Sequence, residues 1–157
     1  MPLDPKPPWG RPAVLAHTQR LLWSYQHWLG RPLWACADPE QAAADLFQAP
    51  WVLVSHGTEA DPIFNYGNQA ALDLWEMDWA HFTQLPSRLS AAPEAQPERA
   101  ARLHQARHQG YLEDYTAIRV SSTGQRFQIR GATLWQVVDV HGHLWGQAAC
   151  FQEWRFL

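Results

Sequence analysis

The sequence has few cysteines, no long apolar run and no large excess of charge of either sign. Its two cysteines, Cys36 and Cys150, lie far apart and outside CxxC or metal-type spacing, which argues against a disulfide framework or a zinc site. Its apolar runs are far shorter than a membrane-spanning helix requires. The proline-broken start, residues 1–8, has neither the apolar core nor the cleavage site of a signal peptide. We therefore expect a cytoplasmic protein without a membrane partner.

Charge is nearly balanced, with 12 Lys and Arg against 15 Asp and Glu and a formal net charge of −3. A net charge this small creates no field that attracts polyanions, so nucleic acid is not expected as a partner. The length of 157 residues suits one domain with a real core.

Tryptophan, by contrast, is abundant, with 10 residues in the chain. Each Trp brings a large apolar area and one N–H group that needs an acceptor. These properties suit a core, a pocket wall or a dimer face equally well, so the composition alone does not choose among them.

The N-terminal part of the chain is predicted to be helical after a flexible, proline-rich tail at residues 1–12. Apolar residues between positions 14 and 29 recur at three- and four-residue spacing, which indicates an amphipathic helix. Asp38 as N-cap and Pro39 in the first turn predict a second, short helix. Because the first helix needs a covering surface, residues 13–48 are predicted to form a cap or the contact of a homodimer.

Short strands and helices are predicted in the middle of the chain. Segments 51–55 and 63–66 are rich in β-formers and separated by a turn-rich stretch, which is typical of two short strands. N-cap residues and a first-turn proline then predict three helices, which begin at Asn68, Asp78 and Pro97. Three β-type segments follow, at 111–121, 126–140 and 144–154. Their short, glycine-containing connections predict an antiparallel meander.

The middle β-type segment alternates between apolar and polar side chains, as in a sheet that is buried on one side. The alternation predicts that the buried face carries Phe127, Ile129, Thr133 and Trp135. The other face carries Arg126 and Arg130, and it is solvent-exposed, a partner surface or a charged pocket wall.

Several long motifs match one known family. They are SHGTEADPIFNYGN at 55–68, ALDLWE at 71–76, LPSR at 85–88, GYLEDY at 110–115, IRVSSTGQRF at 118–127 and GQAA at 146–149. On these motifs the chain resembles the MEKHLA domain family, a PAS-like group, in its free-standing bacterial form. The resemblance implies an α+β fold with two short N-terminal strands, a C-terminal three-stranded meander, short helices on one face and an extra N-terminal amphipathic helix. Residues 49–157 would then form the PAS-like domain.

The resemblance also implies that a small molecule binds between the inner sheet face and the preceding helices. The predicted pocket residues are His56, Tyr66, Trp75, Arg88, Leu103, Phe127, Ile129, Thr133 and Trp135. Light-sensing PAS domains attach flavin to a cysteine in the short helices, and positions 68–90 contain none. A covalent flavin adduct is therefore not expected, whereas bound haem or flavin stays open.

Three groups of polar residues have a possible functional and a structural interpretation. Ser55 and His56 suggest a nucleophile and its base, but neighbouring strand residues point to opposite faces. This favours a structural role, in which the two side chains hydrogen-bond the backbone of the following turn, or a ligand contact of His56 at the pocket mouth. His104 and His108 stand one helical turn apart and could bind a metal ion, although their segment is polar enough to be a solvated face.

Arginine makes up the third group. Guanidinium groups bind carboxylates or phosphates through paired hydrogen bonds, and the candidates are Arg88, Arg119, Arg126 and Arg130. Arg88 lies among apolar residues and is the one predicted to face inward. The structural alternative for the other three is a solvated strand face, paired with acidic residues at little energetic gain, and it is favoured for Arg126.

The sequence predicts a small PAS-like sensory or ligand-binding protein that acts through a separate partner protein or by self-association, with a homodimer expected. One alternative is a small α+β enzyme in which Asp73, Glu76 or Asp114 acts as a base near Tyr66 or Tyr115. No fixed spacing joins a carboxylate to an acid, so catalysis is not favoured. The other alternative is an interaction module whose predicted pocket is simply core.

Overall fold

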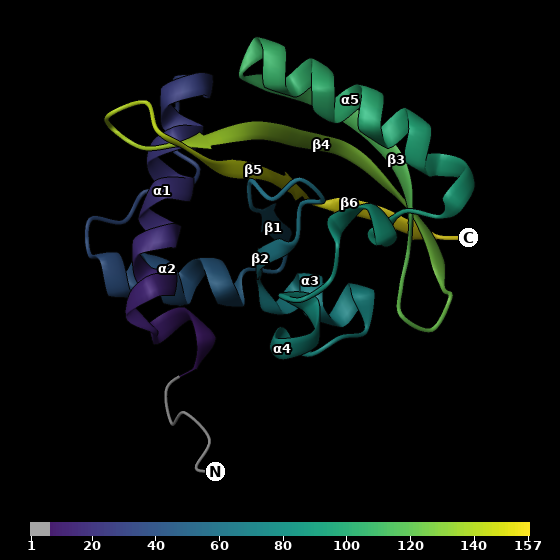
Figure 1. Ribbon diagram of the computed structural model, residues 1–157. Helices are drawn as coiled ribbons and strands as arrows, with labels where there is room; N and C mark the ends of the chain where they lie inside the picture. The colour runs from purple at the N-terminus through teal and green to yellow at the C-terminus, as the bar shows by residue number, and fades with distance from the viewer. Residues whose placement is uncertain (1–6) are drawn as a thin grey trace.

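Six antiparallel strands form one sheet with helices on both faces (Figure 1). The computed structural model describes residues 7–157. The strands run in the order β2-β1-β5-β4-β3, and β6 pairs with β4. Their bounds are β1 (Val52–His56), β2 (Phe64–Gly67), β3 (Tyr111–Val120), β4 (Arg126–Val138), β5 (Leu144–Phe151) and β6 (Glu153–Phe156).

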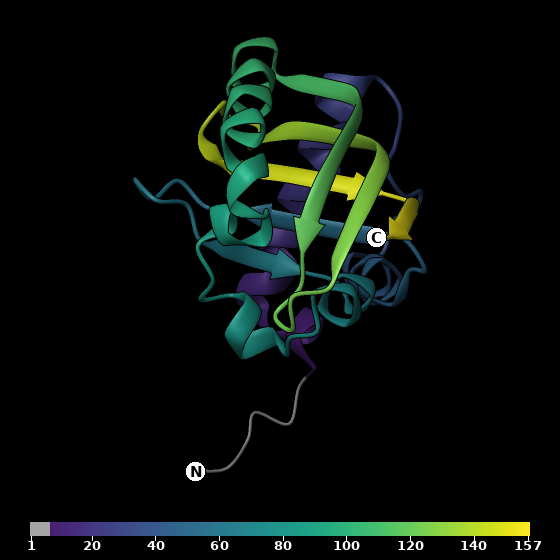
Figure 2. The ribbon, with the colours of Figure 1, turned by 90° about the vertical axis from the view of Figure 1, so that its right-hand side faces the viewer.

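Helices cover the two faces separately. Figure 2 shows α5 in front of the sheet and α1 behind it. Helical bounds are η1 (Pro8–Gly10), α1 (Pro12–Leu29), α2 (Pro39–Gln48), α3 (Gln69–Trp75), α4 (Trp79–Phe82), η2 (Ser87–Ser90), η3 (Pro93–Ala95) and α5 (Gln96–Gln109). Within the described part of the chain, no helix is long and apolar enough to cross a membrane.

Local sequence signals set most helix ends. The Asn68 carboxamide oxygen accepts a hydrogen bond from Ala71 N at 3.1 Å, and the Asp78 carboxylate accepts one from His81 N at 2.8 Å, which confirms both predicted N-caps. Asp38 precedes α2 as predicted but makes no side-chain capping bond. Ordered structure also begins earlier than predicted, because η1 lies inside the proposed tail; the rest of that tail, residues 1–6, lies outside the described residues.

The predicted α+β architecture is confirmed, including the two short strands and the C-terminal meander. The last β-type segment differs in one respect, because it is divided at Gln152 into β5 and β6. Both parts pair with β4 in one continuous register, so the division bends the sheet without changing its order.

The bend reverses which face the side chains of β4 occupy. Gly131 has φ of 64°, Asp114 on the neighbouring β3 has φ of 55°, and the β3–β4 register is irregular on both sides of Tyr115. Such left-handed positions interrupt the regular pleat. The prediction that Thr133 and Trp135 share a face with Ile129 is therefore wrong.

Beyond the bend, the odd-numbered residues of β4 face α1. The Trp135 indole donates a hydrogen bond to Ser24 Oγ at 3.0 Å, and its ring meets Tyr25 edge-on at 5.0 Å. Trp28 Nε1 donates to the Gln136 carbonyl at 2.9 Å. The apolar stripe of α1 is thus covered by the sheet of its own chain, so it no longer argues for a second subunit.

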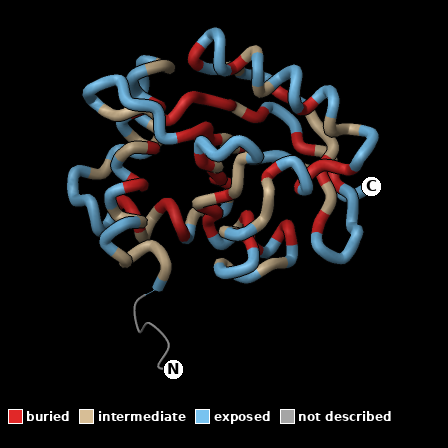
Figure 3. The backbone as a smooth tube through the Cα atoms, viewed as in Figure 1, coloured by how far each residue is buried: buried red, intermediate tan, exposed pale blue. Residues whose placement is uncertain are grey.

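The core lies on both sides of the sheet, as the red segments of Figure 3 indicate along the strands and the inner sides of the helices. Trp135, Phe127 and Tyr66 are among its largest fully buried side chains. The half of the core between the sheet and α5 contains the candidate site.

Candidate functional site

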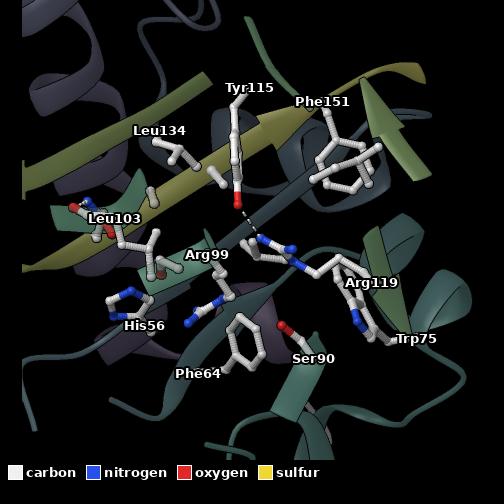
Figure 4. A pocket seen from close by; sticks show the side chains of 16 residues that line it. His56, Phe64, Trp75, Ser90, Arg99, Leu103, Tyr115, Arg119, Leu134 and Phe151 are labelled. Carbon is white, nitrogen blue, oxygen red and sulfur yellow. Dashed lines mark hydrogen bonds between the residues drawn. The ribbon is translucent and has the colours of Figure 1, made fainter. Parts of the chain in front are cut away.

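A cavity lies between α5 and the sheet face that is turned away from α1 (Figure 4). Apolar side chains make most of its wall: Val54, Phe64, Trp75, Leu103, Ile129, Leu134 and Phe151. The centres of water molecules can occupy about 50 Å³ of it, which is room for roughly four waters. The polar lining residues include His56, Ser90, Arg99, Tyr115, Arg119 and Gln147.

Arg99 enters the cavity from the first turns of α5. Its residue is 8% exposed, and its guanidinium donates a hydrogen bond to Ser87 Oγ at 3.0 Å. Burial, followed by the charge of nearby Arg119, lowers the pKa of Arg99 to about 10. The side chain therefore stays charged at neutral pH in a place that disfavours charge.

Arg119 reaches the same cavity from β3. It is 6% exposed and donates to Tyr115 Oη at 3.1 Å and to the Ile118 carbonyl at 3.0 Å. Figure 4 shows the two guanidiniums extending into one space from separate elements.

No carboxylate of residues 7–157 lines the cavity, and within this part of the chain neither Arg99 nor Arg119 forms an ion pair with one. Asp61 influences Arg99 through space, but its carboxylate is bound by Arg88 Nε at 3.2 Å. The protein thus buries two positive charges in a largely apolar cavity without a counter-ion, which is costly.

His56 adds a polar group of a different kind. Its Nδ1–H donates to the Gly57 carbonyl at 3.0 Å, and burial, reinforced by Arg99, lowers the pKa of His56. The ring is therefore neutral with its proton on Nδ1, which makes Nε2 an acceptor. The Gln147 side chain also interacts with the His56 ring and acts to raise its pKa, against the larger effect of burial. No hydrogen bond of regular geometry reaches His56 Nε2 or Trp75 Nε1 among the described residues, and both atoms are buried.

The cavity contains four of the nine predicted pocket residues: His56, Trp75, Leu103 and Ile129. Phe127 packs behind Trp75, with ring centroids 5.2 Å apart. Tyr66 lies near His17 of α1, at a centroid distance of 6.3 Å, and Thr133 borders a groove beside Tyr25.

Arg88 also lies outside the cavity, because its side chain is half exposed and paired with Asp61. The prediction that it faces inward is wrong, since Arg88 and the neighbouring Leu89 lie on the exposed side of the 3₁₀ turn η2, whose serines are the buried residues. Of the four arginines singled out in the sequence, Arg119 is the one that lines the cavity.

Arg99 was missed in the sequence, although a signal was present. It stands four residues before Leu103 and seven before Ala106, which places it on the inward stripe of α5. The alternation of β3 likewise places Arg119 on the face of buried Tyr115.

Ser55 and His56 lie on opposite faces, as the strand alternation predicts. Ser55 is instead 2.8 Å from His17 Nε2 and donates to Asn65 Oδ1 at 2.5 Å. Because the Ser55 hydroxyl donates its hydrogen bond to Asn65, it can only accept one from His17. His17 Nε2 therefore carries a proton and cannot remove the proton of the serine. This buried cluster therefore does not support catalysis.

The carboxylates of the enzyme hypothesis also lie away from the cavity. The Glu76 carboxylate accepts a hydrogen bond from Ser121 Oγ at 2.6 Å, and Asp73 accepts one from Gln69 Nε2 at 2.8 Å. Asp114 borders surface grooves on β3. None of the three can act as a base on a molecule in the cavity.

His104 and His108 do approach each other, with 3.0 Å between their Nε2 atoms on the exposed side of α5. Among the described residues, no group of three or more His, Cys, Asp or Glu side chains could hold a metal ion. The metal hypothesis therefore rests on two imidazoles alone. Haem and flavin do not fit the cavity in this form, because their ring systems are far larger than roughly four water molecules.

We expect His17 to make the protein acid-sensitive. Burial lowers the pKa of His17 to about 4, whereas an unfolded histidine titrates near 6.5. The unfolded chain binds this proton first, so stability is fully retained above pH ~6.5 and falls by about 3 kcal/mol as the pH drops to 4. Urea titrations across this range measure the loss, which His17→Gln should largely remove.

The matched control for His17 is His27→Gln, because His27 is exposed on the same helix. This variant should keep the acid sensitivity of the wild type. The lowered pKa of His56 adds a loss of the same sign, so a residual slope is expected in His17→Gln. An unchanged slope in His17→Gln would exclude His17 as its source.

Comparisons with known proteins agree with the geometry. The model of the MEKHLA domain matches residues 15–156. No curated protein matches the sequence. Many solved structures are similar to this chain, and three of them, with identities of 12–16%, show the fold alone.

The first is a light-oxygen-voltage domain studied with a flavin analogue, with a TM-score of 0.59 and 14% identity over 74% of this chain and 84% of that one. The second is the PAS domain of a protein from Colwellia psychrerythraea, with a TM-score of 0.60 and 12% identity over 75% and 95%. The third is an RNA-binding light-oxygen-voltage receptor, with a TM-score of 0.64 and 16% identity over 77% of this chain and 35% of that receptor.

Proposed function

Because the chain belongs to the MEKHLA domain family and has the fold of PAS sensory domains, we propose that it senses a small molecule bound between α5 and the sheet. The observation that carries the proposal is the set of unpartnered polar atoms at the cavity. His56 Nε2 and Trp75 Nε1 are buried and have no hydrogen-bond partner among residues 7–157. Buried polar groups are almost always paired, and a ligand in the cavity would pair these.

The output of the sensor is proposed to be a change in self-association or in the binding of a partner protein. A homodimer is the first candidate, on a surface other than the apolar stripe of α1. Trp23 on the outer side of α1 is 37% exposed, and Trp145 on β5 is 38% exposed. The guanidinium carbon of Arg20, also on α1, lies 3.8 Å from the centre of the Trp145 ring. Large aromatic side chains at the surface are typical of contact sites.

The other functions receive less support. The enzyme alternative predicted from the sequence needs a carboxylate base at the cavity, and the described lining contains none. One structural neighbour is an RNA-binding receptor, but a formal net charge of −3 does not favour a similar role here. An interaction module with a ligand-free pocket would leave the unpartnered polar atoms of the cavity to water alone.

Native mass spectrometry and an absorption spectrum of the purified full chain test the proposal together. We expect a small mass excess over the 18.0 kDa chain that is lost on denaturation, no visible band, and a monomer–dimer ratio that depends on ligand. A mass-exact chain that no compound in a metabolite library stabilises against heat would contradict small-molecule sensing. A visible chromophore band would show that the cavity opens much further than in this structure.

A further inference from the structure

We propose that the ligand is a short carboxylate that also carries a hydroxyl group, with the acid on Arg99 and Arg119 and the hydroxyl on His56. This inference rests on the proposed function and specifies its ligand class. The three side chains come from α5, β3 and β1 and converge on one cavity (Figure 4).

Charge is the first argument. Arg99 and Arg119 are almost fully buried, the charge of Arg119 contributes to the lowered pKa of Arg99, and neither has a carboxylate partner among the described residues. An anion between them replaces the missing counter-ion. A carboxylate matches the planar, forked donor geometry of guanidinium better than any other small anion.

Free donors are the second argument. A guanidinium has five N–H groups. Within residues 7–157, Arg99 donates only to Ser87, and Arg119 donates to Tyr115 and to the Ile118 carbonyl. Both arginines therefore keep N–H groups for a ligand, while the existing bonds hold their guanidiniums in place.

Size and polarity restrict the anion. A cavity with room for roughly four waters admits only a few non-hydrogen atoms. Its wall is mostly apolar, with Phe64, Leu103 and Leu134 among the lining residues. A phosphate would turn oxygens toward these side chains without donors to meet them, whereas a short carbon chain suits them.

His56 explains the hydroxyl. Its Nδ1–H is already donated to the Gly57 carbonyl, so Nε2 offers a lone pair at the cavity wall. An acceptor requires a donor, and a carboxylate alone has none. A hydroxyl on the carbon chain would supply that donor without adding charge.

Three matched probes separate these elements in calorimetric titrations of the full chain in a carboxylate-free buffer. Lactate has the acid and the hydroxyl, propionate lacks the hydroxyl, and lactamide lacks the charge. We expect lactate to bind, propionate to bind about tenfold more weakly, and lactamide to bind at least ~100-fold more weakly, because each loss leaves a buried group unpaired.

Variants assign the roles. Arg99→Gln and Arg119→Gln should each weaken lactate binding at least ~100-fold. His56→Leu should remove the preference for lactate over propionate. Arg88→Gln is the matched control and should bind as the wild type does, because Arg88 lies outside the cavity and pairs with Asp61. Near-UV circular dichroism checks folding, and the probe series on the wild type remains decisive if a variant fails to fold.

The opposite results are equally specific. Equal binding of lactamide and lactate would overturn the anion assignment, and equal binding of propionate and lactate would overturn the role of His56. Binding of inorganic phosphate by a protein that binds none of the carboxylic acids would also overturn the proposal. A chain that binds none of the acids but still carries another compound in native mass spectra would refute only the ligand class; a chain with neither would refute the proposed function as well.

Discussion

Replacing Trp135 with alanine is expected to lower the free energy of unfolding by about 4 kcal/mol, a loss typical of a large, fully buried aromatic residue. Trp135 is fully buried, its indole donates to Ser24, and its ring contacts Tyr25. The variant therefore leaves a large void between β4 and α1 and removes the donor to Ser24 Oγ, whose own O–H still donates to the Arg20 carbonyl at 2.7 Å. Chemical denaturation followed by far-UV circular dichroism measures the loss.

The matched control for Trp135 is Trp145→Ala, because Trp145 is the same residue type and is 38% exposed. Its loss should stay below about 1 kcal/mol. Trp135→Ala should also leave lactate affinity nearly unchanged wherever the variant is folded, because Trp135 lies on the α1 face, away from the cavity. A large loss of affinity with little loss of stability would return Trp135 to the pocket wall, where the sequence had placed it.

That misplacement shows where sequence reasoning stops. Alternation along residues 126–140 correctly predicts a strand with Phe127 and Ile129 inside the core. The pattern extends to Trp135 only if the pleat is regular, and Gly131 breaks it with a positive φ. A glycine permits this conformation but does not require it, so the sequence cannot say which face follows.

The confirmed predictions of the fold depend on interactions between residues close in the sequence, whereas the missed parts depend on contacts between residues far apart in it. N-caps such as Asn68 and hairpin glycines act within a few residues, and these predictions are confirmed. The position of α1 depends on contacts with β4 more than 100 residues away, as in the 111-residue separation of Ser24 and Trp135. Amphipathicity shows that the helix needs a cover but not what the cover is.

The candidate site was predicted in its apolar parts and missed in its charged parts. Trp75, Leu103 and Ile129 were predicted as pocket residues from the family resemblance, and they obey the rule that apolar residues face the core. Arg99 and Arg119 violate that rule, because a buried charge is normally excluded from such a stripe. Sites that break local rules are where function is expected, since a buried charge without a partner is not retained for stability.

Arg99→Met is accordingly expected to raise the free energy of unfolding of the ligand-free protein by about 2 kcal/mol. A pKa of about 10 for Arg99 is about 2 units below the ordinary range of a guanidinium, which corresponds to a cost of about 3 kcal/mol at all pH values below about 10. Loss of the hydrogen bond to Ser87 offsets about 1 kcal/mol of the gain. Urea denaturation at pH 7 measures the difference.

The same variant links stability to ligand binding. If an anion is the missing counter-ion, saturating lactate should stabilise the wild type and not Arg99→Met, so the gap between the two proteins should narrow or close. Arg88→Met serves as the control, because its exposed pair with Asp61 contributes less than about 1 kcal/mol and should respond to lactate as the wild type does. Destabilisation of ligand-free Arg99→Met would mean that the fold, and not a ligand, requires the buried charge. Stabilisation without ligand combined with loss of the lactate response is the pattern expected of a residue retained for binding at the expense of stability.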